Sequence, residues 1–170
     1  MSPARPPEGA RTAARRAKVP VSVRAALSAL ALALPLAVGA AGAPPSSDLP
    51  DLSAVRERLY RGQFAQAVAQ LRELARTVQH AEVYNLLGYS LRELKQYDEA
   101  AHWYREALLY DPEHRPTLEY QGELFLALGD VAGARRNLRY LELLCGRECA
   151  EYRLLRKAVV DAGHAVGDRR

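Results

Sequence analysis

The stretch "AEVYNLLGYSLRELKQYDEAAHWYREALLYDPEH", Ala81–His114, decides the fold of this chain of 170 residues. Its apolar residues recur at i, i+3 and i+7, the spacing that gathers them on one face of a helix. The segment that follows, 115–148, continues the same frame with the same period of 34 residues. Two consecutive segments in one register predict stacked helical units, each of which buries its apolar face against the next.

Small, aromatic and aliphatic residues mark the shared positions of these two segments. In the first segment the residues at these positions are Tyr84, Leu87, Gly88, Leu91, Ala100, Tyr104, Ala107 and Pro112. In the second they are Leu118, Gly122, Phe125, Ala134, Leu138 and Leu141, with Gln121 in place of the leucine and Gly146 in place of the proline. This pattern resembles the tetratricopeptide repeat, W-x2-L-G-x2-Y…A-x3-F…A…P. The resemblance implies pairs of antiparallel helices that approach closely at Gly88 and Ala100.

Weaker copies of the pattern flank these two repeats. Upstream, "GQFAQAVAQLRELA" aligns with "KQYDEAAHWYREAL" at a spacing of 33, and downstream "AEYRLL" opens a further first helix. The predicted units are a degenerate first repeat at 48–80, repeats at 81–114 and 115–148, a capping helix at 149–162 and a tail at 163–170. The fold class we expect is all-α, a right-handed α-solenoid of about three helix-turn-helix tetratricopeptide units plus a C-terminal capping helix.

The N-terminal segment differs from the rest in composition. Residues 1–43 carry six bases and one acid, and they end in the uncharged run "AALSALALALPLAVGAAGA". A basic segment, an apolar run and small residues are typical of a secretory signal peptide. We therefore expect a signal peptide at 1–43 with cleavage near Ala40 or Ala43, a linker at 44–50, and a periplasmic or secreted bacterial protein. The alternative is an uncleaved membrane anchor, and only in that case is a membrane partner expected.

Charge argues against a nucleic-acid partner. Beyond residue 43 the chain carries 18 Lys and Arg residues against 19 Asp and Glu residues, without a basic stripe. Contacts to phosphates need such a stripe. We expect no nucleic-acid binding.

Cys145 and Cys149 are the only cysteines. The repeat frame places Cys145 at the end of a second helix and Cys149 at the start of the next first helix, with Gly146 breaking the helix between them. In an oxidising compartment this arrangement favours a disulfide. The four histidines are scattered and no C-x-x-C motif is present, so we expect no metal site. A thiol-dependent metal or redox accessory protein, acting through both cysteines, remains the alternative function.

No catalytic motif is present. The chain has no G-x-S-x-G, P-loop or H-E-x-x-H sequence, so we expect neither an enzyme nor a cofactor. The family resemblance instead implies a concave groove lined by positions of successive first helices. The partner-binding residues that it implies are Asn85, Tyr89, Arg92, Glu119, Glu123, Arg153 and Lys157. The predicted function is a non-enzymatic periplasmic scaffold that binds a protein or peptide partner in this groove.

Overall fold

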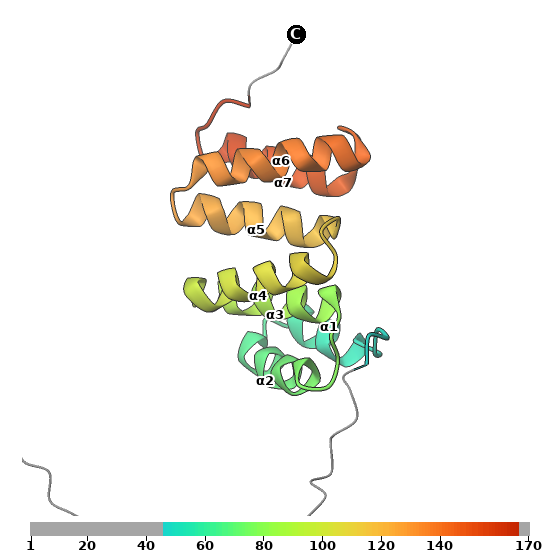
Figure 1. Ribbon diagram of the computed structural model, residues 1–170. Helices are drawn as coiled ribbons and strands as arrows, with labels where there is room; N and C mark the ends of the chain where they lie inside the picture. Colours follow the sequence, from blue (N-terminus) through green and yellow to red (C-terminus); the bar gives the residue numbers. More distant parts are fainter. Residues whose placement is uncertain (1–45, 167–170) are drawn as a thin grey trace, which may run out of the picture. The chain divides into compact units, whose positions relative to one another are not determined.

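The computed structural model describes residues 46–166, and this part of the chain contains helices joined by short turns (Figure 1). The helices are α1 (Ser53–Tyr60), α2 (Phe64–Ala75), α3 (Ala81–Glu93), α4 (Tyr97–Tyr110), α5 (Arg115–Ala127), α6 (Val131–Cys145) and α7 (Ala150–Asp161). The described residues form no strand, apart from one isolated bridge between Ser46 and Val78. The all-α class is therefore as predicted.

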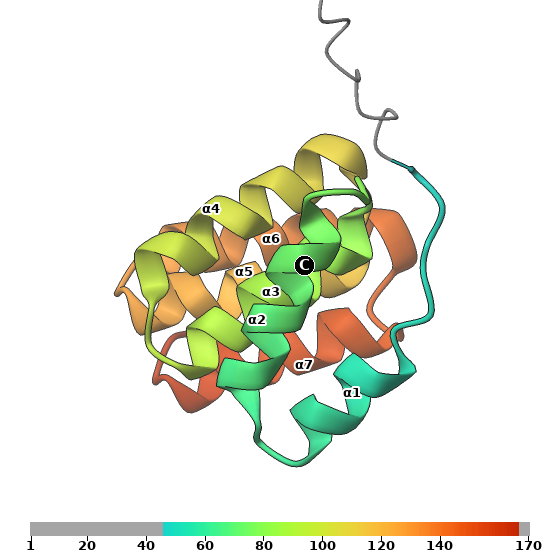
Figure 2. The same ribbon diagram turned by 90° about the horizontal axis from the view of Figure 1, so that it is seen from below.

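Helices that are neighbours in sequence are also neighbours in space. The pairs α1–α2, α3–α4 and α5–α6 are helical hairpins; α3 also packs against α2 and α5, and α5 also packs against α7. Figure 1 shows the pairs stacked from α1–α2 at one end to α6 and α7 at the other. In the view along the stack, α1 and α7 lie on the side opposite α4 (Figure 2). Contacts limited to adjacent units are the hallmark of a solenoid.

The turns inside the hairpins share one backbone form. Gly62 and Gly129 follow the first helices with φ of 69° and 79°, in the left-handed region that glycine adopts without steric cost. At the same point of the middle hairpin stands Lys95, with φ of 60°. After Gly129, Asp130 caps α6: its side chain accepts a hydrogen bond of 2.8 Å from the backbone N–H of Gly133. The repeat frame thus also fixes where each hairpin turns.

The seam between α3 and α4 depends on small residues. Tyr104 and Ala100 of α4 are fully buried, as are Leu87 and Leu91 of α3. A Cβ atom on Gly88 would lie only 2.7 Å from Cδ1 of Tyr104. The close approach expected at Gly88 and Ala100 is therefore present.

Backbone hydrogen bonds join Ser46, which precedes α1, to the loop between α2 and α3. Ser46 donates a backbone hydrogen bond of 2.8 Å to Thr77 and accepts one of 2.8 Å from Gln79. The described part of the predicted linker 44–50 thus lies along the α2–α3 loop. The predicted signal peptide, 1–43, lies outside the described residues, as do residues 167–170 of the tail.

Within residues 46–166, none of the helices combines the length and the apolar character that crossing a membrane requires.

Candidate functional site

The first helices of the three hairpins line a common hollow of about 380 Å³. Its lining residues are Arg56, Leu59 and Tyr60 of α1, Glu82, Asn85, Leu86 and Tyr89 of α3, and Pro116 and Tyr120 of α5. We call this the α1–α3–α5 hollow. Because no single repeat supplies its wall, the hollow exists only through the stacking of the hairpins.

Asn85 lines this hollow and carries a buried hydrogen-bond acceptor that no described residue uses. Its side chain is only 1% exposed, and its Nδ2 donates a hydrogen bond of 3.2 Å to Glu82. Its Oδ1 is buried and has no hydrogen-bond partner among the described residues. The Glu82 carboxylate is held in turn by Arg56 at 2.7 Å and lies 3.5 Å from Nε2 of His114. A buried acceptor without a partner costs free energy, so Asn85 is the lining residue whose hydrogen bonding is incomplete.

Ring contacts hold two aromatic lining residues of the hollow, Tyr89 and Tyr120. The ring centres of Tyr89 and Tyr120 lie 5.0 Å apart, and Phe64 meets Tyr89 edge-on at 6.0 Å. The guanidinium carbon of Arg92 lies 5.4 Å from the centre of the Tyr89 ring. These contacts fix the rings. Tyr60, by contrast, is 94% exposed at the rim.

A charged cluster lies beside the rings, where α3 meets α5. Arg92 donates hydrogen bonds to Glu123 and, at 3.1 Å, to Glu93. Glu119 is buried, and this burial, with the nearby Glu123 carboxylate, raises the pKa of Glu119 to about 8. The Tyr104 hydroxyl is buried without a hydrogen-bond partner among residues 46–166. The cluster therefore links two repeats through a cation shared between carboxylates.

The predicted groove residues fall into two groups. Asn85, Tyr89, Arg92, Glu119 and Glu123 lie together at the α3–α5 interface, in or beside the α1–α3–α5 hollow. Arg153 and Lys157 line a separate hollow on α7.

Sequence reasoning missed the contribution of α1. Arg56 and Leu59 precede Tyr89 and Arg92 by 33 residues, so the spacing that aligned the second helices predicts both as groove positions. Tyr120 lies one residue beyond such a position, and no sequence signal indicates that its ring reaches Tyr89.

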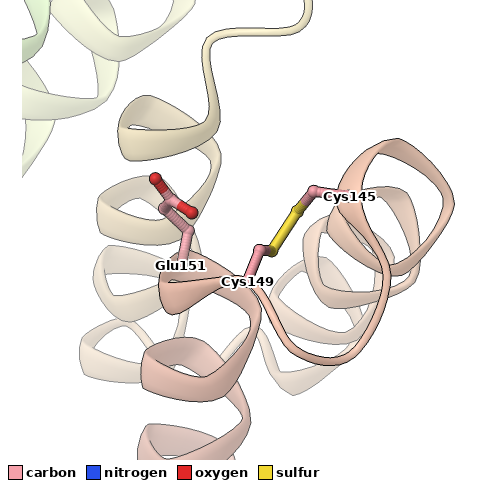
Figure 3. A group of neighbouring side chains, drawn as sticks. All are labelled: Cys145, Cys149 and Glu151. Carbon is pink, nitrogen blue, oxygen red and sulfur yellow. A yellow bond between two sulfur atoms is a disulfide. The ribbon is translucent and has the colours of Figure 1, made fainter.

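The cysteines lie where the repeat frame puts them. Cys145 is the last residue of α6 and Cys149 immediately precedes α7, and their Cα atoms are 5.8 Å apart, within the range of disulfides. Their Sγ atoms are 2.06 Å apart, at bonding distance (Figure 3). That this bond forms in the protein stays a prediction that thiol titration tests.

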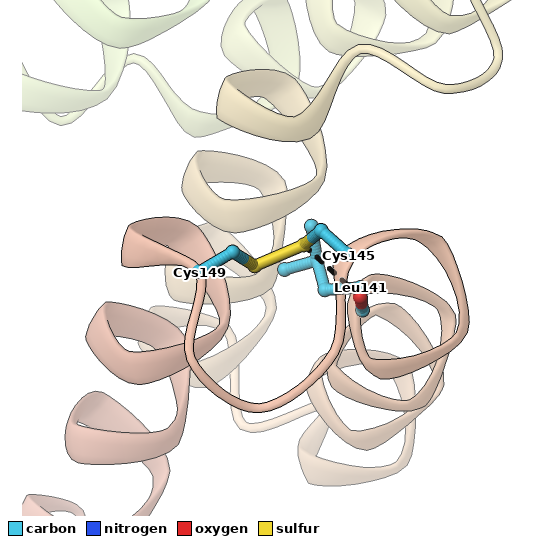
Figure 4. The surroundings of a disulfide bond; sticks show 3 residues. All are labelled: Leu141, Cys145 and Cys149. Carbon is cyan, nitrogen blue, oxygen red and sulfur yellow. Dashed lines mark hydrogen bonds between the residues drawn. A yellow bond between two sulfur atoms is a disulfide. The ribbon is translucent and has the colours of Figure 1, made fainter.

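Two oxygen atoms, from the Leu141 carbonyl and the Glu151 carboxylate, lie near the sulfur atoms of Cys145 and Cys149. The Sγ atom of Cys145 lies 3.2 Å from the carbonyl oxygen of Leu141 in the same helix (Figure 4). A carboxylate oxygen of Glu151 and the two sulfur atoms all lie within 4.8 Å of one another. Once reduced, Cys145, Cys149 and Glu151 could thus offer three ligands to a metal ion.

Over residues 46–166, three stacked helical hairpins followed by α7, with the first helices around a hollow, define a helical repeat architecture. Residues 81–114 match the family model described as tetratricopeptide repeat. Residues 81–114 of the chain are therefore a tetratricopeptide repeat.

One curated protein is similar to this chain in sequence. Over 98 residues the chain is 35% identical to the probable biofilm formation methyltransferase WspC of Pseudomonas aeruginosa. That match takes in 57% of this chain but only 23% of WspC, less than a quarter of its length.

Solved structures share the fold. A crystal structure of PcrH in complex with the chaperone binding region of PopD is similar with a TM-score of 0.56 and 21% identity, over 65% of this chain and 84% of that one. PcrH in complex with the chaperone binding region of PopB gives a TM-score of 0.55 at 21% identity, over 63% of this chain and 87% of that one. At this identity the likeness establishes a common fold.

Proposed function

We propose that this protein is a non-enzymatic scaffold, exported to the periplasm or secreted, that binds an extended segment of a partner protein in the α1–α3–α5 hollow. The observation that carries the proposal is the buried Oδ1 of Asn85, which has no partner among residues 46–166 although its residue lines the hollow. A backbone N–H of an entering peptide supplies the missing donor.

The walls of the hollow suit such a segment. Tyr89 and Tyr120 are held by ring contacts, and they offer apolar surface at little further cost in side-chain entropy. Tyr60 is exposed at the rim and free to close over a bound chain. Arg56 and Glu82 add both signs of charge, so polar side chains of the partner have counterparts.

The structural relatives support a peptide partner. PcrH shares this fold and was crystallised with the chaperone binding regions of PopD and PopB. A protein with this fold can therefore bind a segment of another protein. Export is supported by the basic and then apolar composition of residues 1–43.

Site-specific photo-crosslinking in the organism that produces the protein tests the proposal. A photoreactive phenylalanine replaces Tyr60 at the rim, and the control carries it in place of Leu143 of α6, which is 83% exposed and lies outside the hollow. We expect one protein to be captured from position 60 and not from position 143. Equal capture from both positions, or none from position 60, contradicts the proposed groove.

A second candidate function rests on the sulfur pair and Glu151. In a reducing environment two thiolates and a carboxylate within 4.8 Å favour a soft or borderline cation such as Cu⁺ or Zn²⁺. Titration of the native protein with a thiol reagent separates the two functions. No reactive thiol supports the scaffold with a disulfide, whereas two reactive thiols and one bound metal ion per chain support the accessory role.

A further inference from the structure

The outer surface of α7 carries a second hollow, of about 520 Å³. Its lining residues are Arg147, Glu148, Tyr152, Arg153, Arg156, Lys157 and Val160. Four of the seven are basic and one is acidic. We call this the α7 hollow. The α7 hollow is therefore positively charged, whereas acidic and basic residues are nearly balanced in the chain beyond residue 43.

The repeat register shows that this surface is not built to receive another helix. Gly88 and Gly122 occupy one position of α3 and α5, and a Cβ atom there would lie 2.7 Å and 2.6 Å from the side chain packed on it. The same position of α7, 34 residues further on, is Arg156, and its side chain is exposed. A long charged side chain blocks the close approach that glycine allows. The stack therefore ends at α7 with a charged face.

The cations of the α7 hollow are only partly neutralised. Arg147 donates a hydrogen bond of 2.7 Å to Glu142, and Lys157 pairs with Asp161. Arg153 and Arg156 have no acidic partner among the described residues. Two guanidinium groups, each with several donors, thus face solvent within one concavity.

The hollow continues the groove surface of the earlier repeats. Arg153, Lys157 and Val160 stand on α7 at the register of Asn85, Tyr89 and Arg92 on α3. A partner segment that crosses the first helices from α1 through α5 therefore meets the α7 hollow next in the stack, because α5 packs directly against α7.

We infer that the α7 hollow binds an acidic stretch of the partner protein, with Arg153 and Arg156 as the residues that grip its carboxylates. This inference deepens the proposed function and rests on it. Carboxylates suit guanidinium groups in paired hydrogen bonds, and the ring of Tyr152 and the side chain of Val160 give the peptide an apolar floor. A nucleic acid fits less well, because its phosphates would also meet the carboxylates of Glu82, Glu119 and Glu123 on the neighbouring first helices.

Fluorescence anisotropy with a fluorescein-labelled hexaglutamate peptide tests the inference on the purified protein. We expect saturable binding that weakens as salt is raised, since the contacts are ionic and exposed. In Arg153→Glu/Arg156→Glu the dissociation constant should rise at least about tenfold. The matched control is Arg105→Glu/Arg139→Glu on α4 and α6, which makes the same change in net charge at two exposed sites outside the hollow. The control should bind as the wild type does.

Three results would overturn the inference. They are the absence of binding by the wild-type protein, equal losses in both double variants, and binding to phosphatidylserine vesicles without binding to hexaglutamate. None of these touches the α1–α3–α5 hollow. If crosslinking from position 60 still captures a partner while hexaglutamate fails to bind, the inference is wrong and the proposed function stands. If position 60 also captures nothing, both are wrong.

Discussion

Substitution of Gly88 by alanine probes the seam between α3 and α4 directly. The added Cβ atom would lie 2.7 Å from both Cδ1 and Cε1 of Tyr104, whereas ordinary contact begins at 3.4 Å. The Tyr104 ring is fully buried, so it cannot swing into solvent to make room. Either the ring or helix α3 must therefore move by about 0.7 Å, the difference between these distances.

Two effects of opposite sign decide the outcome. Alanine is favoured over glycine inside a helix by about 1 kcal/mol, and overpacking of a filled core costs about 1–3 kcal/mol. Because Tyr104 is held on all sides, we expect the larger part of that cost and a net loss of about 1–2 kcal/mol in the free energy of unfolding. Urea denaturation of the purified protein measures this loss.

The same substitution in a Tyr104→Leu variant separates the clash between residues 88 and 104 from other effects of alanine at position 88. Leu138 occupies the position of Tyr104 in the next repeat, so Tyr104→Leu introduces a side chain that the fold already uses there. Gly88→Ala should cost at least about 1 kcal/mol less in the Tyr104→Leu background, a coupling expected only of residues in contact. The control, Gly129→Ala, adds a Cβ atom with nothing within 4 Å and should show no coupling to position 104. Gly88→Ala as stable as the wild type, or equally costly in both backgrounds, would refute the packing argument.

Three further predictions concern single features of the described residues. Lys95→Gly should raise the free energy of unfolding by about 1 kcal/mol in urea denaturation, because Lys95 has a φ of 60° where the other hairpins use glycine; a loss of stability would contradict this account of the turn. Burial and Glu123 raise the pKa of Glu119 to about 8 from its usual 4.5, so the folded protein holds a proton that the unfolded chain has released. The stability should therefore fall as pH rises from about 5 to 8, by up to about 1.4 kcal/mol per pH unit, and Glu119→Gln should flatten this slope; the same slope in both proteins would refute the assignment. The free energy of unfolding of the oxidised wild type should be about 2 kcal/mol higher than that of Cys145→Ser/Cys149→Ser in the same assay, because the disulfide would constrain the unfolded chain. Equal free energies would argue against a structural disulfide.

The sequence alone predicted the parts of the fold that repeat. Gly88, Ala100 and Tyr104 recur at family positions, and each lies in the seam because its size is needed there. The placement of Cys145 and Cys149 around a helix break follows from the same register. A periodic pattern specifies such features because each of them is decided within one unit and its neighbour.

Features that depend on how units are rotated against one another were not predictable in the same way. The ion pair between Arg92 and Glu123 joins two repeats, and the contact between Tyr89 and Tyr120 depends on the angle at which α3 meets α5. The positive φ of Lys95 was missed for a different reason: the register aligns Lys95 with Gly62 and Gly129, but lysine as a residue type does not indicate the left-handed region. The alignment of Ser46 with Thr77 and Gln79 likewise follows no repeat position.

Hydrogen exchange of the protein with and without its crosslinked partner tests most directly the claim that the first helices bind. The account predicts added protection in α1, α3 and α5, around Arg56, Asn85 and Tyr120, with little change in α4 and α6. Protection confined to α4 and α6, with the first helices unchanged, would contradict it.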